Sequence, residues 1–173
     1  MDFEEKTLEK NVIYSGKILN LRKDTVSLPD GHTGTREIIE HSGGSAILCE
    51  KDDKILMVRQ FRYAYRKEVW EIPAGKVNAG EDPLTTAFRE LEEEGGIKAD
   101  NMELLFSVYP SPGYTSEIIR IYRATGLKET HVHLDEDEFL SAEWVEKPRL
   151  KKMIENGEIN DSKTLIALLF ALR

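Results

Sequence analysis

A short segment in the middle of the chain constrains its fold more than any other. Pro83 suits a first helical turn, Asp82 or Glu81 can cap it, and Gly95 with Gly96 can end it. Between these signals, apolar residues recur at the three- and four-residue spacing of a helix face: Leu84, Ala87, Phe88 and Leu91. We therefore predict an amphipathic helix over residues 83–94.

The same segment ends in a run of glutamates that is unfavourable for stability. Glu90, Glu93 and Glu94 share a second helix face. Like charges at these spacings, and carboxylates at a helix C-terminus, each cost a few tenths to about 1 kcal/mol. Arg89 can pair with Glu92 or Glu93 but cannot neutralise them all. The run is either a solvated, salt-bridged face or the site of a hard cation such as Mg²⁺, which binds carboxylates together with substrate phosphates.

The residues around this run form a longer motif. Gly75 is followed after five residues by Glu81, and after seven more by Arg89-Glu90-Leu91-Glu92-Glu93-Glu94-Gly95-Gly96-Ile97. This pattern matches the Nudix box at every defined position. The chain resembles the Nudix hydrolases, which cleave nucleoside diphosphates linked to another moiety. The resemblance implies the α/β class: a Nudix-type α/β/α sandwich with a mixed β-sheet, plus a small N-terminal β subdomain.

The resemblance also implies roles for the residues of the motif. Glu90 and Glu94 would be the principal metal ligands, with Glu93 supporting them and serving as a further catalytic candidate. The backbone carbonyl of Ala74 would be another ligand. Arg89 would orient the glutamates, and we expect Gly75 to allow a backbone turn that a side chain would obstruct. The expected ion is Mg²⁺, with Mn²⁺ as a substitute.

Composition and charge favour a globular cytoplasmic enzyme. The chain has 173 residues, of which 40% are hydrophobic and 32% charged, which suits one domain with a core and argues against disorder. It shows no apolar run of membrane-spanning length, and its acidic start is unlike a signal peptide. The single cysteine, Cys49, excludes an internal disulfide and reads as a buried structural thiol. A net charge of −8 argues against nonspecific nucleic-acid binding.

We predict two parts of unequal size. Residues 1–42 form an N-terminal β subdomain, with strand material at 16–28, a turn at Pro29-Asp30-Gly31 and a returning strand at 36–40. A hinge at 41–44 leads into a Nudix hydrolase domain, residues 43–173. We expect strands near 45–50, 54–60, 69–72, 104–109, 117–124 and 139–145, and helices near 83–94, 148–156 and 161–172. The last helix is capped by Asp161, and its apolar body should be well buried.

A second acidic cluster, residues 133–139, precedes the last expected strand. It is either a hydrophilic loop or the source of a general base that positions the attacking water. Nudix enzymes of the ADP-ribose type carry their catalytic glutamate in the corresponding loop. The candidates are Glu136 and Glu138, and the sequence does not choose between them. His131 and His133 are read as solvent-exposed loop histidines.

Three further features resemble the ADP-ribose pyrophosphatase branch. Pro112 and Gly113 lie in a Ser-Pro-Gly-Tyr-Thr-Ser-Glu segment at the spacing typical of that branch, although a rigid turn explains them too. Arg62 follows Val58-Arg59-Gln60-Phe61 and would contact the pyrophosphate. Arg36 and Glu37 resemble substrate-contacting residues in an N-terminal appendage. A serine at position 42, where relatives have proline, indicates a looser hinge.

The expected activity is therefore Mg²⁺-dependent hydrolysis of ADP-ribose to AMP and ribose 5-phosphate. One alternative is a hydrolase of another nucleoside diphosphate sugar, such as GDP-mannose. Another is a catalytically silent ADP-ribose-binding domain, although such domains usually lose the box glutamates. We also expect a homodimer with a swapped N-terminal segment, since exposed strand edges favour pairing. An intramolecular flap over the chain's own site is the alternative.

Overall fold

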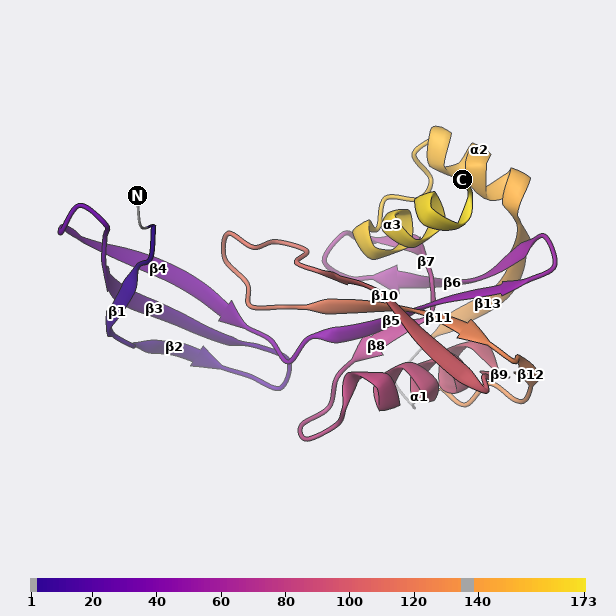
Figure 1. The fold of residues 1–173 in the computed structure, drawn as a ribbon, viewed down its shortest axis with the longest axis horizontal. Helices are drawn as coiled ribbons and strands as arrows, with labels where there is room; N and C mark the ends of the chain where they lie inside the picture. Colours follow the sequence, from indigo (N-terminus) through magenta and orange to yellow (C-terminus); the bar gives the residue numbers. More distant parts are fainter. Residues whose placement is uncertain (1–2, 135–138) are drawn as a thin grey trace. The chain divides into compact units, whose positions relative to one another are not determined.

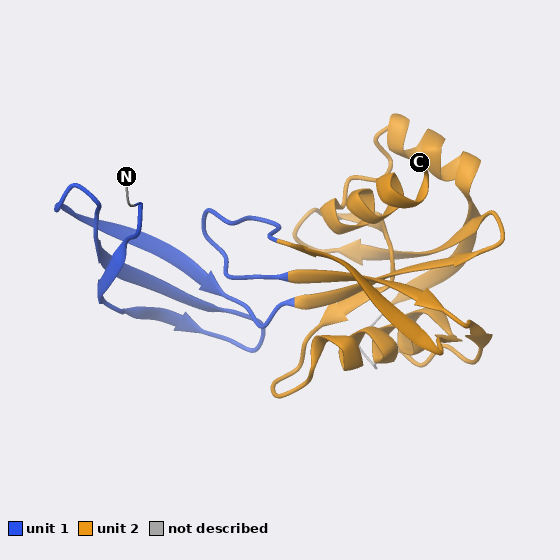
Figure 2. Cartoon of the chain, viewed as in Figure 1, with its two compact units in different colours: residues 1–43, 109–118 blue, residues 44–108, 119–173 orange. Residues whose placement is uncertain are grey.

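The computed structural model describes residues 3–134 and 139–173, which fold into two compact units (Figure 2). The first unit comprises residues 1–43 and 109–118, and the second comprises residues 44–108 and 119–173. Glu136 and Glu138, the candidate bases, lie outside the described residues. In the described part of the chain, no helix has the length and apolar character needed to cross a membrane.

The first unit is a small antiparallel sheet built around one central strand. One neighbour pairs along the full length of this strand, and two short strands pair with successive halves of its other edge. The central strand is β3 (Asn20–Ser27), the full-length neighbour is β4 (Thr33–Glu40), and the short strands are β1 (Lys6–Glu9) and β2 (Val12–Ser15).

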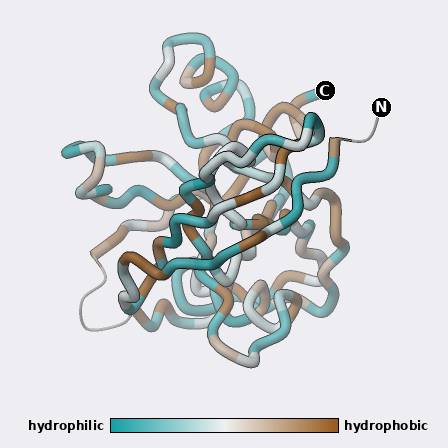
Figure 3. Tube along the Cα trace, turned by 90° about the vertical axis from the view of Figure 1, so that its left-hand side faces the viewer, coloured by the Kyte–Doolittle hydropathy of each residue, from teal (hydrophilic) through white to brown (hydrophobic). Residues whose placement is uncertain are grey.

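The predicted turn joins β3 to β4. The Leu28 N–H donates to the His32 carbonyl at 2.7 Å, and Gly31 has a φ of 87°, which favours glycine. Hydrophobic residues recur among hydrophilic ones along the strands of this unit (Figure 3). Several of those on β1 and β2 are exposed: Leu8, Val12, Ile13 and Tyr14.

Residues 109–118 complete the first unit by bonding to β4. The Ile39 N–H donates to the Tyr114 carbonyl at 2.7 Å, and the Ser116 N–H donates to the Ile39 carbonyl at 2.9 Å. Gly43 ends the N-terminal segment with a φ of 90°, and a Cβ there would lie 2.7 Å from the Ile118 carbonyl oxygen. Only glycine fits this position without moving the backbone.

The second unit is built on a mixed seven-stranded sheet. Its main order is β10-β11-β5-β6-β13, with β7 paired to β6 and β8 paired to β5. β11 and β5 run parallel, and the other pairs are antiparallel. The strands are β5 (Gly44–Lys51), β6 (Lys54–Arg62), β7 (Lys67–Glu71), β8 (Ala74–Lys76), β10 (Asn101–Val108), β11 (Ile119–Thr125) and β13 (Leu140–Glu146). A separate short pair joins β9 (Ile97–Lys98) to β12 (Lys128–Glu129).

Helices cover both faces of this sheet (Figure 1). α1 (Pro83–Gly95) lies on one face, and α2 (Lys147–Glu155) and α3 (Ser162–Ala171) lie on the other. Each face has its own core because neighbouring residues of a strand point to opposite sides. Ile47 of β5 packs in the core with the α1 residues, and the next residue, Leu48, packs in the core with the other two helices. The unit is an α/β/α sandwich, which confirms the predicted fold class.

Two local expectations need correction and one is confirmed. The body of α3 is less buried than predicted, because Leu169 is 58% exposed while Ala167 and Leu168 are buried. The five short strands β1, β2, β8, β9 and β12 were not predicted as separate elements. Cys49 is fully buried, and burial raises the pKa of its thiol to about 12, so it is the structural thiol that was expected.

Candidate active site

The glutamate run belongs to α1, whose ends follow the predicted capping signals. The Asp82 side chain accepts the Leu84 N–H at 2.9 Å, and Gly96 adopts the left-handed conformation that ends the helix. The predicted helix is confirmed and extends one residue further, to Gly95. Its apolar stripe is narrower than expected, because Leu84 is 39% exposed whereas Ala87 and Leu91 are buried.

Two of the glutamates lie on the buried face of this helix. Glu90 is 7% exposed and Glu94 is 4% exposed, and they alternate along the helix with the buried Ala87 and Leu91. A solvated face is therefore the wrong description of these two carboxylates. Burying a charge is costly unless a counter-charge or hydrogen bonds compensate it, so the surroundings of this pair decide what it does.

Arg89 connects the glutamates of the motif. Its Nη1 lies 2.7 Å from both Glu90 Oε1 and Glu93 Oε2, and its Nε donates to Glu81 Oε1 at 3.0 Å. The hydrogen bond with Glu81 contributes most to raising the pKa of Arg89, and it lowers the pKa of Glu81 to about 2. Of the two partners considered for Arg89, Glu93 is the one bound, while Glu92 pairs with Lys98 at 3.1 Å.

The backbone of β8 passes directly over the two buried glutamates. The Ala74 N–H donates to Glu94 Oε2 at 2.8 Å. A Cβ at Gly75 would lie 1.9 Å from Glu90 Oε1, so any side chain there would collide with the carboxylate. Gly75 lies in a strand rather than in the turn that we predicted. Glycine is required because of the close approach of the backbone to Glu90, and not because of a bend.

The arrangement fits a divalent metal ion. A hard cation binds protein oxygens, and Mg²⁺ in particular takes one or two carboxylates and completes its ligands with water and substrate phosphates. Glu90 and Glu94 supply two carboxylates on one helix face. Within the described ranges, no group of three or more His, Cys, Asp or Glu side chains is arranged to hold a metal ion by itself. Two carboxylates are fewer ligands than Mg²⁺ takes, so this pair suits a site that shares its ion with water and a substrate.

Arg62 has partners that the sequence analysis did not identify. Its Nε and Nη2 donate to the two carboxylate oxygens of Glu71 at 2.6 and 2.7 Å. Lys163 of α3 donates to Glu71 Oε2 at 2.5 Å. Burial alone would raise the pKa of Glu71, but Arg62 and Lys163 outweigh it and lower that pKa. The available signal was a charge among apolar residues: Glu71 lies between Trp70 and Ile72, and Lys163 is the one charged residue of α3.

The remaining candidates for substrate contact lie in the first unit. Arg36 and Glu37 are on β4, where Arg36 forms an ion pair with Glu5, with its Nε 2.8 Å from Glu5 Oε2. Pro112 and Gly113 form an exposed turn. The predicted site residues are thus divided between the two units, with Arg36, Glu37, Pro112 and Gly113 in the first and Arg62, Ala74, Gly75, Arg89, Glu90, Glu93 and Glu94 in the second.

The loop that leads to the candidate bases begins at the end of α1. The Thr130 N–H donates to the Gly96 carbonyl at 2.7 Å, and the His133 N–H donates to the Glu93 carbonyl at 3.0 Å. Two residues after His133, the described part of the chain is interrupted, and it resumes at Phe139. His131 and His133 are exposed, as expected of loop histidines.

Comparison with known proteins identifies the family. The family model for the NUDIX domain matches residues 40–168, and that for the nucleoside diphosphate sugar hydrolase N-terminal domain matches residues 5–39. The chain belongs to the Nudix family. Members of this family generally use divalent metal ions.

Several individual proteins are similar to this chain over most of its length. One is the methanol dehydrogenase activator of Bacillus methanolicus, 46% identical over 96% of this chain and 91% of that protein. Another is the ADP-ribose pyrophosphatase of Bacillus subtilis, 42% identical over 95% of this chain and 91% of that protein. The crystal structure of an ADP compounds hydrolase shares the fold, with a TM-score of 0.85 at 19% identity over 99% of this chain and 94% of that one.

Proposed function

We propose that this protein hydrolyses the diphosphate bond of ADP-ribose to AMP and ribose 5-phosphate, with Mg²⁺ as the metal and Mn²⁺ as a substitute. The observation that carries this proposal is the pair of buried glutamates, Glu90 and Glu94, which lie against the backbone of β8. The absence of a side chain at Gly75 leaves room there for the Glu90 carboxylate. The similarity to the ADP-ribose pyrophosphatase of Bacillus subtilis supports the choice of substrate.

Glu90 and Glu94 would hold the metal ion, with Glu93 and the carbonyl of Ala74 as further ligands. A bound divalent ion supplies an activated water and neutralises phosphate charge. Arg89 keeps Glu90 and Glu93 in place through its 2.7 Å contacts, and Glu81 fixes the other edge of its guanidinium. Arg62 would contact the diphosphate.

A carboxylate in the loop before β13 would be the general base, either Glu136 or Glu138. Both lie outside the described residues. The hydrogen bond from the His133 N–H to the Glu93 carbonyl supports this role, because it ties the start of that loop to the last turn of α1. A Gln variant of the true base should lower kcat about 10²–10⁴-fold with little change in KM. Wild-type turnover in both single variants and the double variant would place the base elsewhere.

The most informative experiment is a substrate panel in ¹⁸O-labelled water with Mg²⁺. It compares ADP-ribose, ADP-glucose and GDP-mannose, and the masses of the products identify both the substrate and the attacked phosphorus. We expect ADP-ribose to have the highest kcat/KM. Preference for GDP-mannose would assign the chain to another nucleoside diphosphate sugar. Binding of ADP-ribose without turnover would indicate the catalytically silent domain.

We further propose that residues 1–42 act as a dimerisation and substrate-contact subdomain for the hydrolase domain, residues 43–173, in a cytoplasmic homodimer. The exposed apolar residues of β1 and β2, such as Val12 and Tyr14, support this, since exposed strands of this kind favour pairing with another chain. Arg36 and Glu37 would then contact the nucleoside diphosphate sugar bound to the partner, and Pro112 and Gly113 are further candidates for substrate contact. A match of residues 5–39 to a dedicated N-terminal domain family agrees with a separate role for this segment.

Mixing two damaged chains tests this shared site. Arg36→Ala and Glu94→Gln chains are each expected to be nearly inactive, and a hybrid dimer would rebuild one intact site from two chains. Recovery of activity on mixing supports the swapped arrangement. A monomer that remains fully active at nanomolar concentration would contradict it and favour the intramolecular flap.

A further inference from the structure

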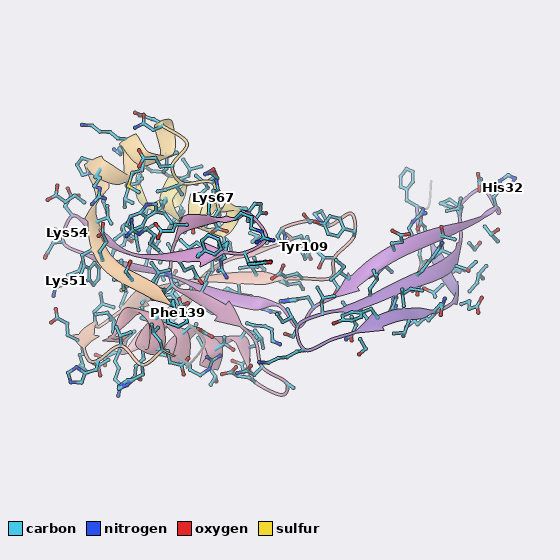
Figure 4. The ribbon with its side chains drawn as sticks, turned by 180° about the vertical axis from the view of Figure 1, so that it is seen from behind. His32, Lys51, Lys54, Lys67, Tyr109 and Phe139 are labelled. Atoms are coloured by element: carbon cyan, nitrogen blue, oxygen red, sulfur yellow. The ribbon has the colours of Figure 1, made fainter. Side chains whose placement is uncertain are left out.

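A buried ion network joins the ends of β6 and β7 to the start of α3. It comprises Arg62, Glu71, Asp161 and Lys163, which line a cavity of about 470 Å³. Lys67, labelled in Figure 4, lines the same cavity from the start of β7. All four residues of the network lie outside the Nudix box, which spans Gly75 to Ile97.

Glu71 is the centre of the network. Its side chain is 2% exposed, and both of its oxygens are bound by Arg62 while one also accepts from Lys163. Two cations therefore share one carboxylate. A bidentate arginine–carboxylate pair is among the most directional contacts in proteins, so Glu71 fixes the plane of the Arg62 guanidinium.

Arg62 has one edge directed away from this carboxylate. Its Nε and Nη2 bind Glu71, and Nη1 has no hydrogen-bond partner among the described residues. The side chain is 42% exposed, in contrast to the buried Glu71 and Lys163. Three of the five N–H donors of the guanidinium, two of them on Nη1, are thus not used in binding Glu71.

Lys163 is fixed by the chain around it. Its Nζ also lies 3.0 Å from Asp161 Oδ2, and Asp161 caps α3 by accepting the Thr164 N–H at 3.0 Å. Thr164 in turn accepts the Ile72 N–H at 3.0 Å. The start of α3 is therefore joined to the end of β7 by an ion pair and by a separate hydrogen bond.

We propose that Lys163 is a positioning residue for the diphosphate contact: acting through Glu71, it holds Arg62 with its Nη1 edge towards the substrate. This inference rests on the proposed function in one respect, the contact between Arg62 and the diphosphate. Lys163 Nζ and Arg62 Nη2 bind the same oxygen of Glu71, so Lys163 limits the positions available to that carboxylate and to the guanidinium bound to it.

A double-mutant cycle of ADP-ribose binding tests this proposal. Binding is measured calorimetrically in metal-free buffer for the wild type, Lys163→Met, Arg62→Ala and the double variant. Lys163→Met should weaken binding about 10-fold in the wild-type background and change it little in the Arg62→Ala background, because residues that act through one contact are not additive. Lys163→Gln, which keeps a donor to Glu71 without the charge, replaces the methionine variant if that one fails to fold.

Two matched controls separate positioning from structure. Thr164→Val removes both hydrogen bonds of the Thr164 hydroxyl, with the Ile72 N–H and with Asp161 Oδ2, while the contact of Lys163 with Glu71 remains; it should lower stability without changing the affinity for ADP-ribose. Lys128 lies on β12 and forms an exposed ion pair with Asp100. Lys128→Met removes this positive charge outside the network and should leave the affinity for ADP-ribose unchanged.

The outcomes distinguish this proposal from the proposed function. An equal loss of affinity from Lys163→Met in both backgrounds, or no loss in the wild-type background, overturns the positioning role. Wild-type affinity in Arg62→Ala also overturns it. Binding with the predicted coupling but without turnover in Mg²⁺ overturns only the hydrolase function. Absence of ADP-ribose binding by the wild type overturns the positioning role, and it overturns the hydrolase function too when turnover in Mg²⁺ is also absent.

Discussion

Two groups of buried carboxylates in the second unit have opposite surroundings. Glu71 is bound by both Arg62 and Lys163, and with Asp161 this network holds two cations and two carboxylates. On α1, one guanidinium, that of Arg89, contacts three carboxylates, those of Glu81, Glu90 and Glu93. A fully compensated carboxylate stabilises the fold, whereas a crowded acidic face suits a cation supplied from outside. Glu71 and Glu90 are both buried, so burial alone does not distinguish a structural charge from a functional one.

Removing a carboxylate from α1 should have the largest effect on activity. In Glu94→Gln, we expect kcat with Mg²⁺ to fall about 10³-fold or more, because a metal ligand is lost. The amide oxygen can still accept the Ala74 N–H, so the fold should remain. Glu92→Gln is the matched control, because Glu92 lies on the same helix and pairs with Lys98 outside this face. Normal Mg²⁺-dependent turnover in Glu94→Gln would refute the assignment.

Removing the carboxylate from the compensated network should affect stability instead. Glu71→Gln leaves Arg62 and Lys163 without their shared counter-charge, and we expect a loss of about 3–5 kcal/mol in the free energy of unfolding. Glu94→Gln in metal-free buffer should be as stable as the wild type or more stable, since it relieves repulsion. Urea denaturation of both variants measures this difference. Equal losses would show that the two groups do not differ as described.

A methyl group at Gly75 should disturb activity more than stability. Alanine there would occupy the space of the Glu90 carboxylate. The end of a glutamate side chain can turn away, so the stability loss should be about 1 kcal/mol or less. Because a displaced catalytic group costs about 10²-fold in rate, we expect kcat of Gly75→Ala to fall by that order. A large stability loss with unchanged kcat would contradict this.

Acid pH should weaken the compensated network. The pKa of Glu71 is lowered from its ordinary value of 4.5, so its contribution to stability is fully present above that pH and is lost as pH falls through the lowered value. A tenfold difference in proton affinity between the folded and unfolded states corresponds to about 1.4 kcal/mol. The wild type should therefore lose stability below pH 4.5 more steeply than Glu71→Gln, measured by urea denaturation at each pH. If the stability of the wild type and of Glu71→Gln falls equally steeply with decreasing pH, Glu71 is not a cause of acid sensitivity.

Sequence reasoning predicted the parts of the structure that depend on local chemistry. The ends of α1 follow from its cap residue Asp82 and its terminal glycines, and α2 and α3 were located within one residue at each end. The main strands of the sheet follow from their apolar runs. The short strands, such as β8 at Ala74–Lys76, have too few residues to show a period, and their pairing depends on distant partners.

The site could be predicted only where a motif defines it. The box glutamates were identified, but the burial of Glu90 and Glu94 was not, because it depends on the backbone of β8 crossing α1. The network around Glu71 was missed for a similar reason. Glu71 and Lys163 are 92 residues apart in sequence, and only the packing of α3 on the sheet brings them together.

Metal-dependent stability tests the central claim most directly, because it requires no assumption about the substrate. Urea denaturation of the wild type and of Glu94→Gln is repeated as Mg²⁺ is raised from zero to well above its dissociation constant. A ligand that binds only the folded state at 100 times its dissociation constant adds about 2.7 kcal/mol to the free energy of unfolding. We predict a rise of this kind in the wild type and none in Glu94→Gln. A wild type that does not respond, or a variant that responds equally, would contradict a metal site on α1.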